Sequence, residues 1–97
     1  MVVHIVLFSF QDEEKQRHIE KAREMLEALP EKVETLREIE VGVNFSDKER
    51  AMDLSIVTRF DNRVGLEVYA THPEHVKVVE YLKTVVKESR VVDYMLD

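Results

Sequence analysis

The opening segment, residues 2–10, is apolar on both of the side-chain sets that alternate along a β-strand. One set comprises Val2, His4, Val6, Phe8 and Phe10, and the other comprises Val3, Ile5 and Leu7. Because β-branched and aromatic residues favour extended structure, the pattern predicts a strand. A strand with two apolar faces needs a cover on each side, so the fold must place a layer of the protein or of a partner against both faces.

The rest of the chain changes repeatedly between helical and strand periodicity. Asp12 and Asp61 are expected to cap the first two helices, and Pro30 is expected to end the first. In chain order the predicted segments are a strand over residues 2–10, a helix over 12–29, strands over 33–43 and 52–60, a short helix over 62–71, a longer helix from Pro73, and a strand from Ser89 that ends on Asp97.

This order predicts an α+β fold, a ferredoxin-like βαββαβ protomer whose antiparallel sheet carries its helices on one face. Val3, Ile5 and Leu7 would then be exposed on the other face of a monomer. A contiguous apolar patch on a sheet usually marks a partner surface. We therefore expect a homodimer, in which two protomers pack sheet to sheet into an α/β barrel.

Composition narrows the functional classes. The chain has 97 residues, enough for a single domain over residues 1–97, and a net charge of −6 that would repel nucleic acid and anionic membranes. It contains no cysteine, and no stretch approaches the roughly 20 apolar residues that span a bilayer. The expected location is cytoplasmic, with neither nucleic acid nor membrane as a partner.

The residues Tyr69-Ala70-Thr71-His72-Pro73-Glu74-His75 gather a phenol and two imidazoles around a proline. Proline disfavours helical geometry in the preceding residue, so one helix should stop near His72 and the next should begin at Pro73. His75 falls on the apolar stripe of the second helix, and His4 lies on an apolar strand face. Proton abstraction beside a carbonyl needs a base and a hydrogen-bond donor, which a neutral His75 and Tyr69 would supply.

The same residues also allow a purely structural interpretation. Tyr69 and His75 would then be buried polar groups that hold the helical corner, and His4 a satisfied core histidine. His72 is expected to cap a helix or face solvent, although it also counts among the candidate ligand contacts with Phe8 and Leu54. Asp93 and Tyr94 are expected to fix the sheet edge or the dimer seam. A metal site is not expected, since the histidines lack further converging ligands, and no glycine-rich phosphate loop is present.

The opening His4-Ile5-Val6-Leu7-Phe8-Ser9-Phe10, Phe60, Tyr69 with His72-Pro73-Glu74-His75, and Val92-Asp93-Tyr94 together resemble the stress-responsive dimeric α/β barrel (Dabb) family. The resemblance implies a ferredoxin-like protomer in a barrel dimer. A plant member, olivetolic acid cyclase, closes a polyketide chain by acid-base chemistry without a cofactor. Its catalytic tyrosine and histidine resemble Tyr69 and His75, its first-strand histidine resembles His4, and a further pocket histidine is replaced here by Leu54.

Three functions follow as alternatives. The first is a pocket between sheet and helices that binds a small hydrophobic or carbonyl-containing molecule and acts as a cofactor-free lyase, cyclase or isomerase. Its expected lining is His4, Phe8, Leu54, Tyr69 and His75. The second is a non-catalytic dimeric binding or structural module, and the third, by analogy of fold, is a cofactor-free oxygenase.

Overall fold

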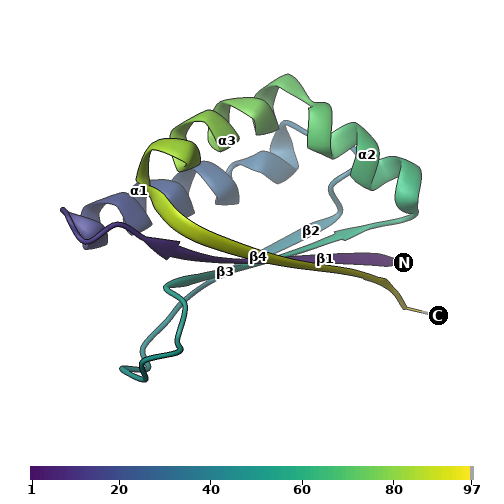
Figure 1. Cartoon of the computed structure of the whole chain (residues 1–97). Helices are drawn as coiled ribbons and strands as arrows, with labels where there is room; N and C mark the ends of the chain where they lie inside the picture. Colours follow the sequence, from purple (N-terminus) through teal and green to yellow (C-terminus); the bar gives the residue numbers. More distant parts are fainter. Residues whose placement is uncertain (97) are drawn as a thin grey trace.

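The computed structural model describes residues 1–96 as one four-stranded antiparallel sheet with helices on one face (Figure 1). Asp97, where the last strand is expected to end, lies outside the described residues. The predicted ferredoxin-like order is confirmed. The elements are β1 (Val2–Phe10), α1 (Lys15–Glu27), a 3₁₀ turn (Leu29–Glu31), β2 (Glu38–Val43), β3 (Leu54–Phe60), α2 (Arg63–Thr71), α3 (Pro73–Val85) and β4 (Val86–Met95).

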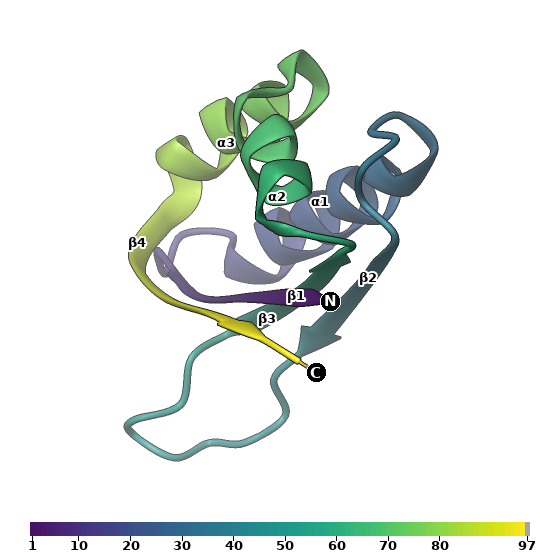
Figure 2. The same cartoon turned by 90° about the vertical axis from the view of Figure 1, so that its right-hand side faces the viewer.

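The strand order is β2-β3-β1-β4, so the doubly apolar β1 is central and β4 is an edge. His4 lies opposite Thr58 on β3 and Asp93 on β4. Directly paired residues point to the same face of an antiparallel sheet, so all three side chains stand on the helix-covered face with Val2 and Phe8. The helices pack mainly over β1, β2 and β3, and Figure 2 shows β4 at the sheet edge beside α2 and α3.

The core lies between the sheet and the helices. Phe10 and Phe60 are fully buried at the ends of β1 and β3, and Leu26 of α1 and Leu82 of α3 close over them. Truncating a buried aromatic side chain of this kind to alanine typically costs about 3–5 kcal/mol of stability. This packed layer fixes the position of α2 and α3, which carry two of the candidate site residues.

Two predicted helix caps are wrong. The first helix begins at Lys15 instead of near Asp12, and its N-cap is Glu14, whose φ of 50° is left-handed and whose side chain makes no cap bond. Lys15 Nζ lies 3.5 Å from Asp12, so that carboxylate pairs with an ammonium and does not cap the helix.

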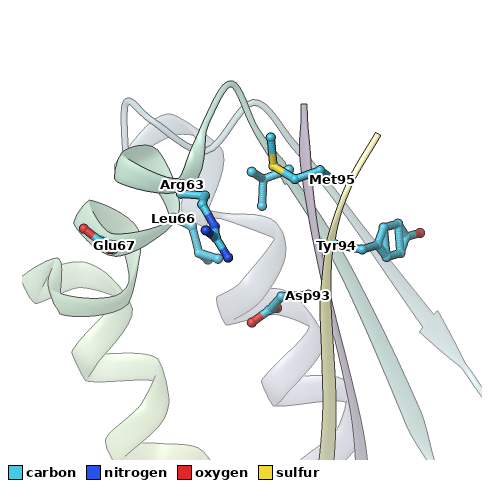
Figure 3. A pocket seen from close by; sticks show the side chains of 7 residues that line it. Arg63, Leu66, Glu67, Asp93, Tyr94 and Met95 are labelled. Atoms are coloured by element: carbon cyan, nitrogen blue, oxygen red, sulfur yellow. The ribbon is translucent and has the colours of Figure 1, made fainter. Parts of the chain in front are cut away.

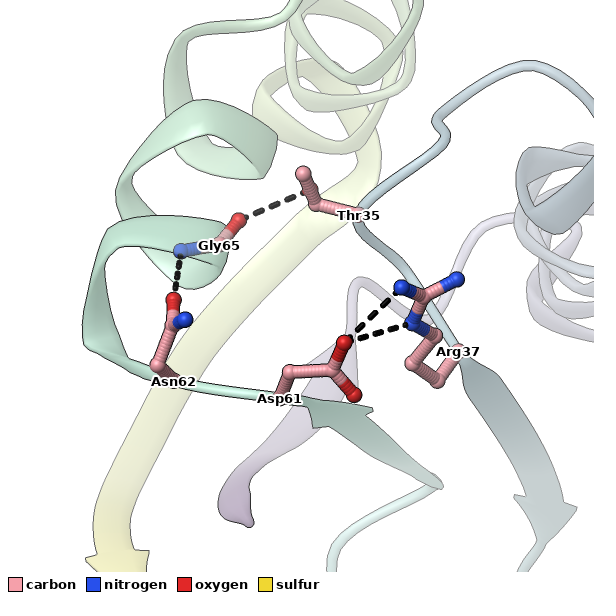
Figure 4. Close-up of polar contacts among 5 residues, drawn as sticks. All are labelled: Thr35, Arg37, Asp61, Asn62 and Gly65. Atoms are coloured by element: carbon pink, nitrogen blue, oxygen red, sulfur yellow. Dashed lines mark hydrogen bonds and ion pairs between the residues drawn. The ribbon is translucent and has the colours of Figure 1, made fainter.

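At α2 the cap is Asn62 and not Asp61 (Figure 4). The Asn62 Oδ1 accepts a hydrogen bond from Gly65 N at 2.9 Å. Asp61 instead accepts two hydrogen bonds from Arg37, at 2.8 and 3.1 Å, which hold the pKa of its carboxyl below the ordinary value. The Asp61 carboxylate therefore pairs with the Arg37 guanidinium, and the neutral Asn62 side chain accepts the hydrogen bond from the first turn of the helix.

The predicted exposure of the second face of β1 is wrong for Val3, which is fully buried, while Ile5 and Leu7 are half-buried. Val3 pairs directly with Arg59 and Tyr94, whose long side chains stand beside it on the same face. The most exposed apolar residue of this helix-free face is instead Val92 of β4, at 53%.

The segment between β2 and β3 extends away from the sheet on the side opposite the helices (Figure 1). It carries Phe45, whose side chain is fully exposed. No helix within residues 1–96 is both long and apolar enough to cross a membrane.

Candidate functional site

The corner between α2 and α3 is held by His72. Its backbone is extended, with φ −64° and ψ 134°, so it ends α2 and begins α3, as the following Pro73 predicts. The His72 Nδ1 accepts a hydrogen bond from Glu74 N at 3.1 Å, which makes the imidazole the N-cap of α3. His72 was among the expected ligand contacts, but its Nδ1 is occupied in capping α3.

His75 lies in the first turn of α3 and packs against Tyr69 of α2, with ring centroids 4.1 Å apart. Its Nδ1 is 3.2 Å from the carbonyl oxygen of Ala70. Because a carbonyl oxygen only accepts, this contact assigns the proton to Nδ1 and leaves a lone pair on Nε2. Burial lowers the pKa of His75 below 6.5, so the imidazole is neutral near pH 7.

Tyr69 lies between the sheet and His75. Its side chain is 3% exposed and packs on the Phe60 ring, with centroids 5.1 Å apart. Burial raises the pKa of Tyr69, so the phenol keeps its proton and acts as a donor. The hydroxyl makes no hydrogen bond within residues 1–96, yet it is not among the fully enclosed unpartnered polar atoms, so it retains some access from outside.

His4 reaches this group from the sheet. Its ring meets the edge of Tyr69 at a centroid distance of 6.5 Å, and its Nδ1 bonds the carboxylate of Asp93, the direct neighbour on β4. A carboxylate only accepts, so Nδ1 of His4 also carries a proton and Nε2 is the atom available to a ligand. The His4 side chain is 20% exposed and that of Asp93 is 48% exposed.

Asp93 was expected to act only at the sheet edge, and the structure adds it to the site. The side chains of Asp93, His4, Tyr69 and His75 form one continuous row from β4 across β1 to the helical corner. Asp93 could be assigned to the site only by knowing that it pairs directly with His4, which puts both side chains on the same face of the sheet. That pairing depends on the register of β1 and β4, which the sequence does not fix.

The two other expected ligand contacts lie farther along the sheet. Phe8 and Leu54 are direct partners on β1 and β3. Leu54 is 2% exposed within the core, whereas Phe8 is half-buried and reaches a hollow between α3 and β4. Opposite His4 itself stands Thr58, which is fully buried and donates to the His4 carbonyl at 3.2 Å.

Two hollows along β4 flank the row of polar side chains. One has a volume of about 270 Å³ between α2 and β4, where Arg63 and Leu66 face Asp93 (Figure 3). The other, of about 380 Å³, lies toward Phe8 and Val79. Neither hollow is lined by Tyr69 or His75, so a ligand would reach that pair by way of Asp93 and His4 or from the Val79 side.

Residues 2–96 match the family described as "Stress responsive A/B Barrel Domain". A Bacteroides fragilis structure described as a dimeric protein of unknown function with a ferredoxin-like fold shares 37% identity, at a TM-score of 0.90 over 98% of this chain and 95% of that one. A dimeric ferredoxin-like protein from Thermobifida fusca shares 22% identity, at a TM-score of 0.87 over 98% and 90%.

A hydroxynitrile lyase from Passiflora edulis has the same fold at a TM-score of 0.87, with 14% identity over 99% of this chain and 93% of that one. At that identity the likeness concerns the fold alone. No protein with a curated function matches the sequence.

Proposed function

Because the chain belongs to the stress-responsive A/B barrel domain family, we propose that it acts as a homodimer in which each protomer binds a small carbonyl-containing molecule beside β4, α2 and α3. There it performs acid-base chemistry without a cofactor, of the lyase, cyclase or isomerase kind. The observation that carries this proposal is the contact between His75, a neutral imidazole with a free Nε2, and Tyr69, a protonated phenol.

His75 has the properties of a general base. Its Nδ1 proton is engaged by Ala70 and burial disfavours its charged form, so the basic lone pair on Nε2 persists near neutral pH. A positioned base of this kind typically contributes roughly 10²–10⁴-fold to a rate. The backbone carbonyl also fixes the ring orientation, which limits Nε2 to one direction of attack.

Tyr69 would stabilise the charge that the base creates. The buried phenol donates a hydrogen bond without losing its proton, and burial strengthens that bond. His4 is held through Nδ1 by Asp93, so its Nε2 presents a lone pair that accepts a hydrogen bond from a ligand hydroxyl. The two groups come from different elements, α2 and β1, so a donor and an acceptor reach the ligand from two sides.

In the proposed step, Nε2 of His75 removes a proton from the carbon beside the ligand carbonyl. The electron pair of that C–H bond forms the C=C bond of an enolate, and the carbonyl oxygen takes the negative charge beside Tyr69. Where the enolate is conjugated with a further C=C bond of the ligand, return of the proton from His75 at the far carbon gives isomerisation. Attack of the enolate carbon on a second carbonyl forms a C–C bond and turns that carbonyl oxygen into an alkoxide, which takes the proton from His75 and completes cyclisation.

The homodimer is supported by the helix-free face of the sheet. Val92 and Tyr94 of β4 remain 53% and 41% exposed there, and the segment with Phe45 projects on the same side. Relatives with this fold from Bacteroides fragilis and Thermobifida fusca are described as dimeric. A second copy packed on this face would complete the cover of β1 that the monomer supplies only in part.

A second candidate is a dimeric binding or structural module without catalysis. Two observations favour it: Tyr69 and His75 do not line the two hollows along β4, and Leu54 is sealed in the core. In that case the aromatic contacts of Tyr69 would serve only to hold the corner.

The two candidates differ in hydrogen exchange. Cyclohexanone, an uncharged ketone, is incubated with the protein in heavy water, and proton NMR follows the loss of signal from the carbons beside the carbonyl. The first candidate expects exchange by the wild type and a loss of roughly 10²-fold or more in His75→Gln.

His18→Gln serves as the matched control, because His18 is an imidazole that contacts Tyr81 between α1 and α3, away from the site. It should keep the wild-type exchange rate. Exchange no faster than buffer, or equal rates in His75→Gln and the wild type, would favour the non-catalytic module.

A further inference from the structure

The hollow between α2 and β4 has a composition that the proposed chemistry does not use. Its walls include the apolar side chains of Val2, Leu66 and Met95, and its polar groups are Arg63, Glu67 and Asp93. A small cavity with apolar walls and a few convergent polar groups is the usual form of a ligand site. Its volume of about 270 Å³ limits the occupant to a small molecule.

Arg63 is the distinctive group of this hollow. Its side chain extends from the first turn of α2 toward β4, where the Asp93 carboxylate faces it (Figure 3). Within residues 1–96 Arg63 forms no ion pair: Asp93 is engaged with His4, and the candidate partner Glu67, four residues along α2, does not pair with it. With no such partner among residues 1–96, the donors of the guanidinium fork can bond a ligand at the hollow.

The charges around Arg63 restrict what it can bind. A planar carboxylate matches the guanidinium fork with two parallel hydrogen bonds. The Asp93 carboxylate also borders the hollow, so a dianion such as phosphate would be repelled more strongly there than a monoanion. The first turn of α2 adds a partial positive charge on the same side.

The position of the hollow connects this anion site to the proposed chemistry. Asp93 borders the hollow and bonds His4, whose ring contacts Tyr69. A molecule held by its carboxylate at Arg63, with its apolar body against Leu66 and Val2, would extend toward that row. We propose that Arg63 is a specificity-determining residue that selects small monocarboxylates carrying a carbonyl group, a class that rests on the proposed function.

The test compares levulinate, a small keto acid, with methyl levulinate, its uncharged ester, by NMR titration of the full chain. We expect levulinate to bind the wild type more tightly than the ester. Arg63→Gln should weaken levulinate roughly ten- to hundredfold, the range for lost hydrogen bonds to a charged group, and leave the ester unchanged. Arg63→Lys should recover part of the loss, because it restores charge without the fork.

Arg17→Gln is the matched control, since it removes an exposed arginine that pairs with Glu14 on α1. It should leave both affinities unchanged. Equal binding of acid and ester, no binding of either, or a preference that survives in Arg63→Gln would overturn the inference. Failure of the proposed function would appear in a different measurement, the hydrogen exchange of cyclohexanone, which depends on His75 and does not involve Arg63.

Discussion

The imidazole of His75 lies against the phenol ring of Tyr69, with the two centroids 4.1 Å apart and the planes inclined by 34°. The two residues come from different helices, α3 and α2, and meet because His72 and Pro73 turn the chain sharply between them. The contact therefore depends on local geometry, and it places a neutral base beside a neutral donor.

The pH dependence of stability should carry a contribution from His75. Burial lowers the pKa of His75 in the folded state below its ordinary value of 6.5, so the unfolded chain binds more protons in the interval between the two values. The free energy of unfolding should therefore rise with pH across that interval and level off above 6.5. Urea unfolding at a series of pH values measures this slope, and His75→Gln should flatten it, whereas an unchanged slope would contradict a buried neutral imidazole.

Tyr69→Phe should separate catalysis from folding. The substitution keeps the ring that packs on Phe60 and removes only a hydroxyl that bonds nothing within residues 1–96, so stability should change by no more than about 0.5 kcal/mol. Exchange catalysis should fall roughly 10²–10³-fold, as expected for the loss of an oxyanion donor. Equal exchange rates in Tyr69→Phe and the wild type would remove the phenol from the reaction.

Asp93→Asn should remove the preference of His4 for the tautomer that carries its proton on Nδ1. The carboxylate accepts from Nδ1 and holds the proton there, whereas an amide can also donate and so tolerates either tautomer. Nitrogen NMR of the His4 ring should show a defined Nδ1-protonated form in the wild type and a mixture in the variant. Asp47→Asn, in the loop after β2, is the control and should leave the His4 signals unchanged.

Local rules were sufficient for the corner. Proline restricts His72 to extended geometry whatever the rest of the chain does, and the helical period then places His75 on the apolar side of α3. The confirmed order of strands and helices likewise follows from periodicity within short segments. These features depend on neighbours in sequence, which is why they could be predicted from the sequence.

Features that depend on distant neighbours could not be predicted in this way. Asp93 meets His4 only because β1 and β4, at opposite ends of the chain, pair in one register, and a slip of one residue would turn Asp93 to the other face. Val3 is buried by its cross-strand partners. Asp61 does not cap α2 because its carboxylate pairs with Arg37, which is distant in sequence. The hollow beside Arg63 depends in the same way on where the edge strand β4 lies relative to α2.

The cap of α2 offers a direct comparison of two adjacent residues. Asn62→Ala removes the acceptor of the Gly65 amide and should lower the free energy of unfolding by about 1 kcal/mol. Asp61→Ala removes an exposed partner of Arg37 and should cost less, because solvent screens that pair. Chemical denaturation of both variants decides between them, and a larger loss in Asp61→Ala would reinstate the aspartate as the cap.

The oligomeric state should respond to charge on the helix-free face of the sheet. Val92→Asp places a carboxylate at the most exposed apolar position of that face, where a second sheet would bury it without a partner, so the dimer should dissociate. Val64→Asp is the matched control, because Val64 is 64% exposed on α2, on the other side of the protomer. Sedimentation equilibrium should give a dimer mass for the wild type and Val64→Asp and a monomer mass for Val92→Asp. A wild-type monomer at every concentration, or a dimer that tolerates Val92→Asp, would place the partner elsewhere.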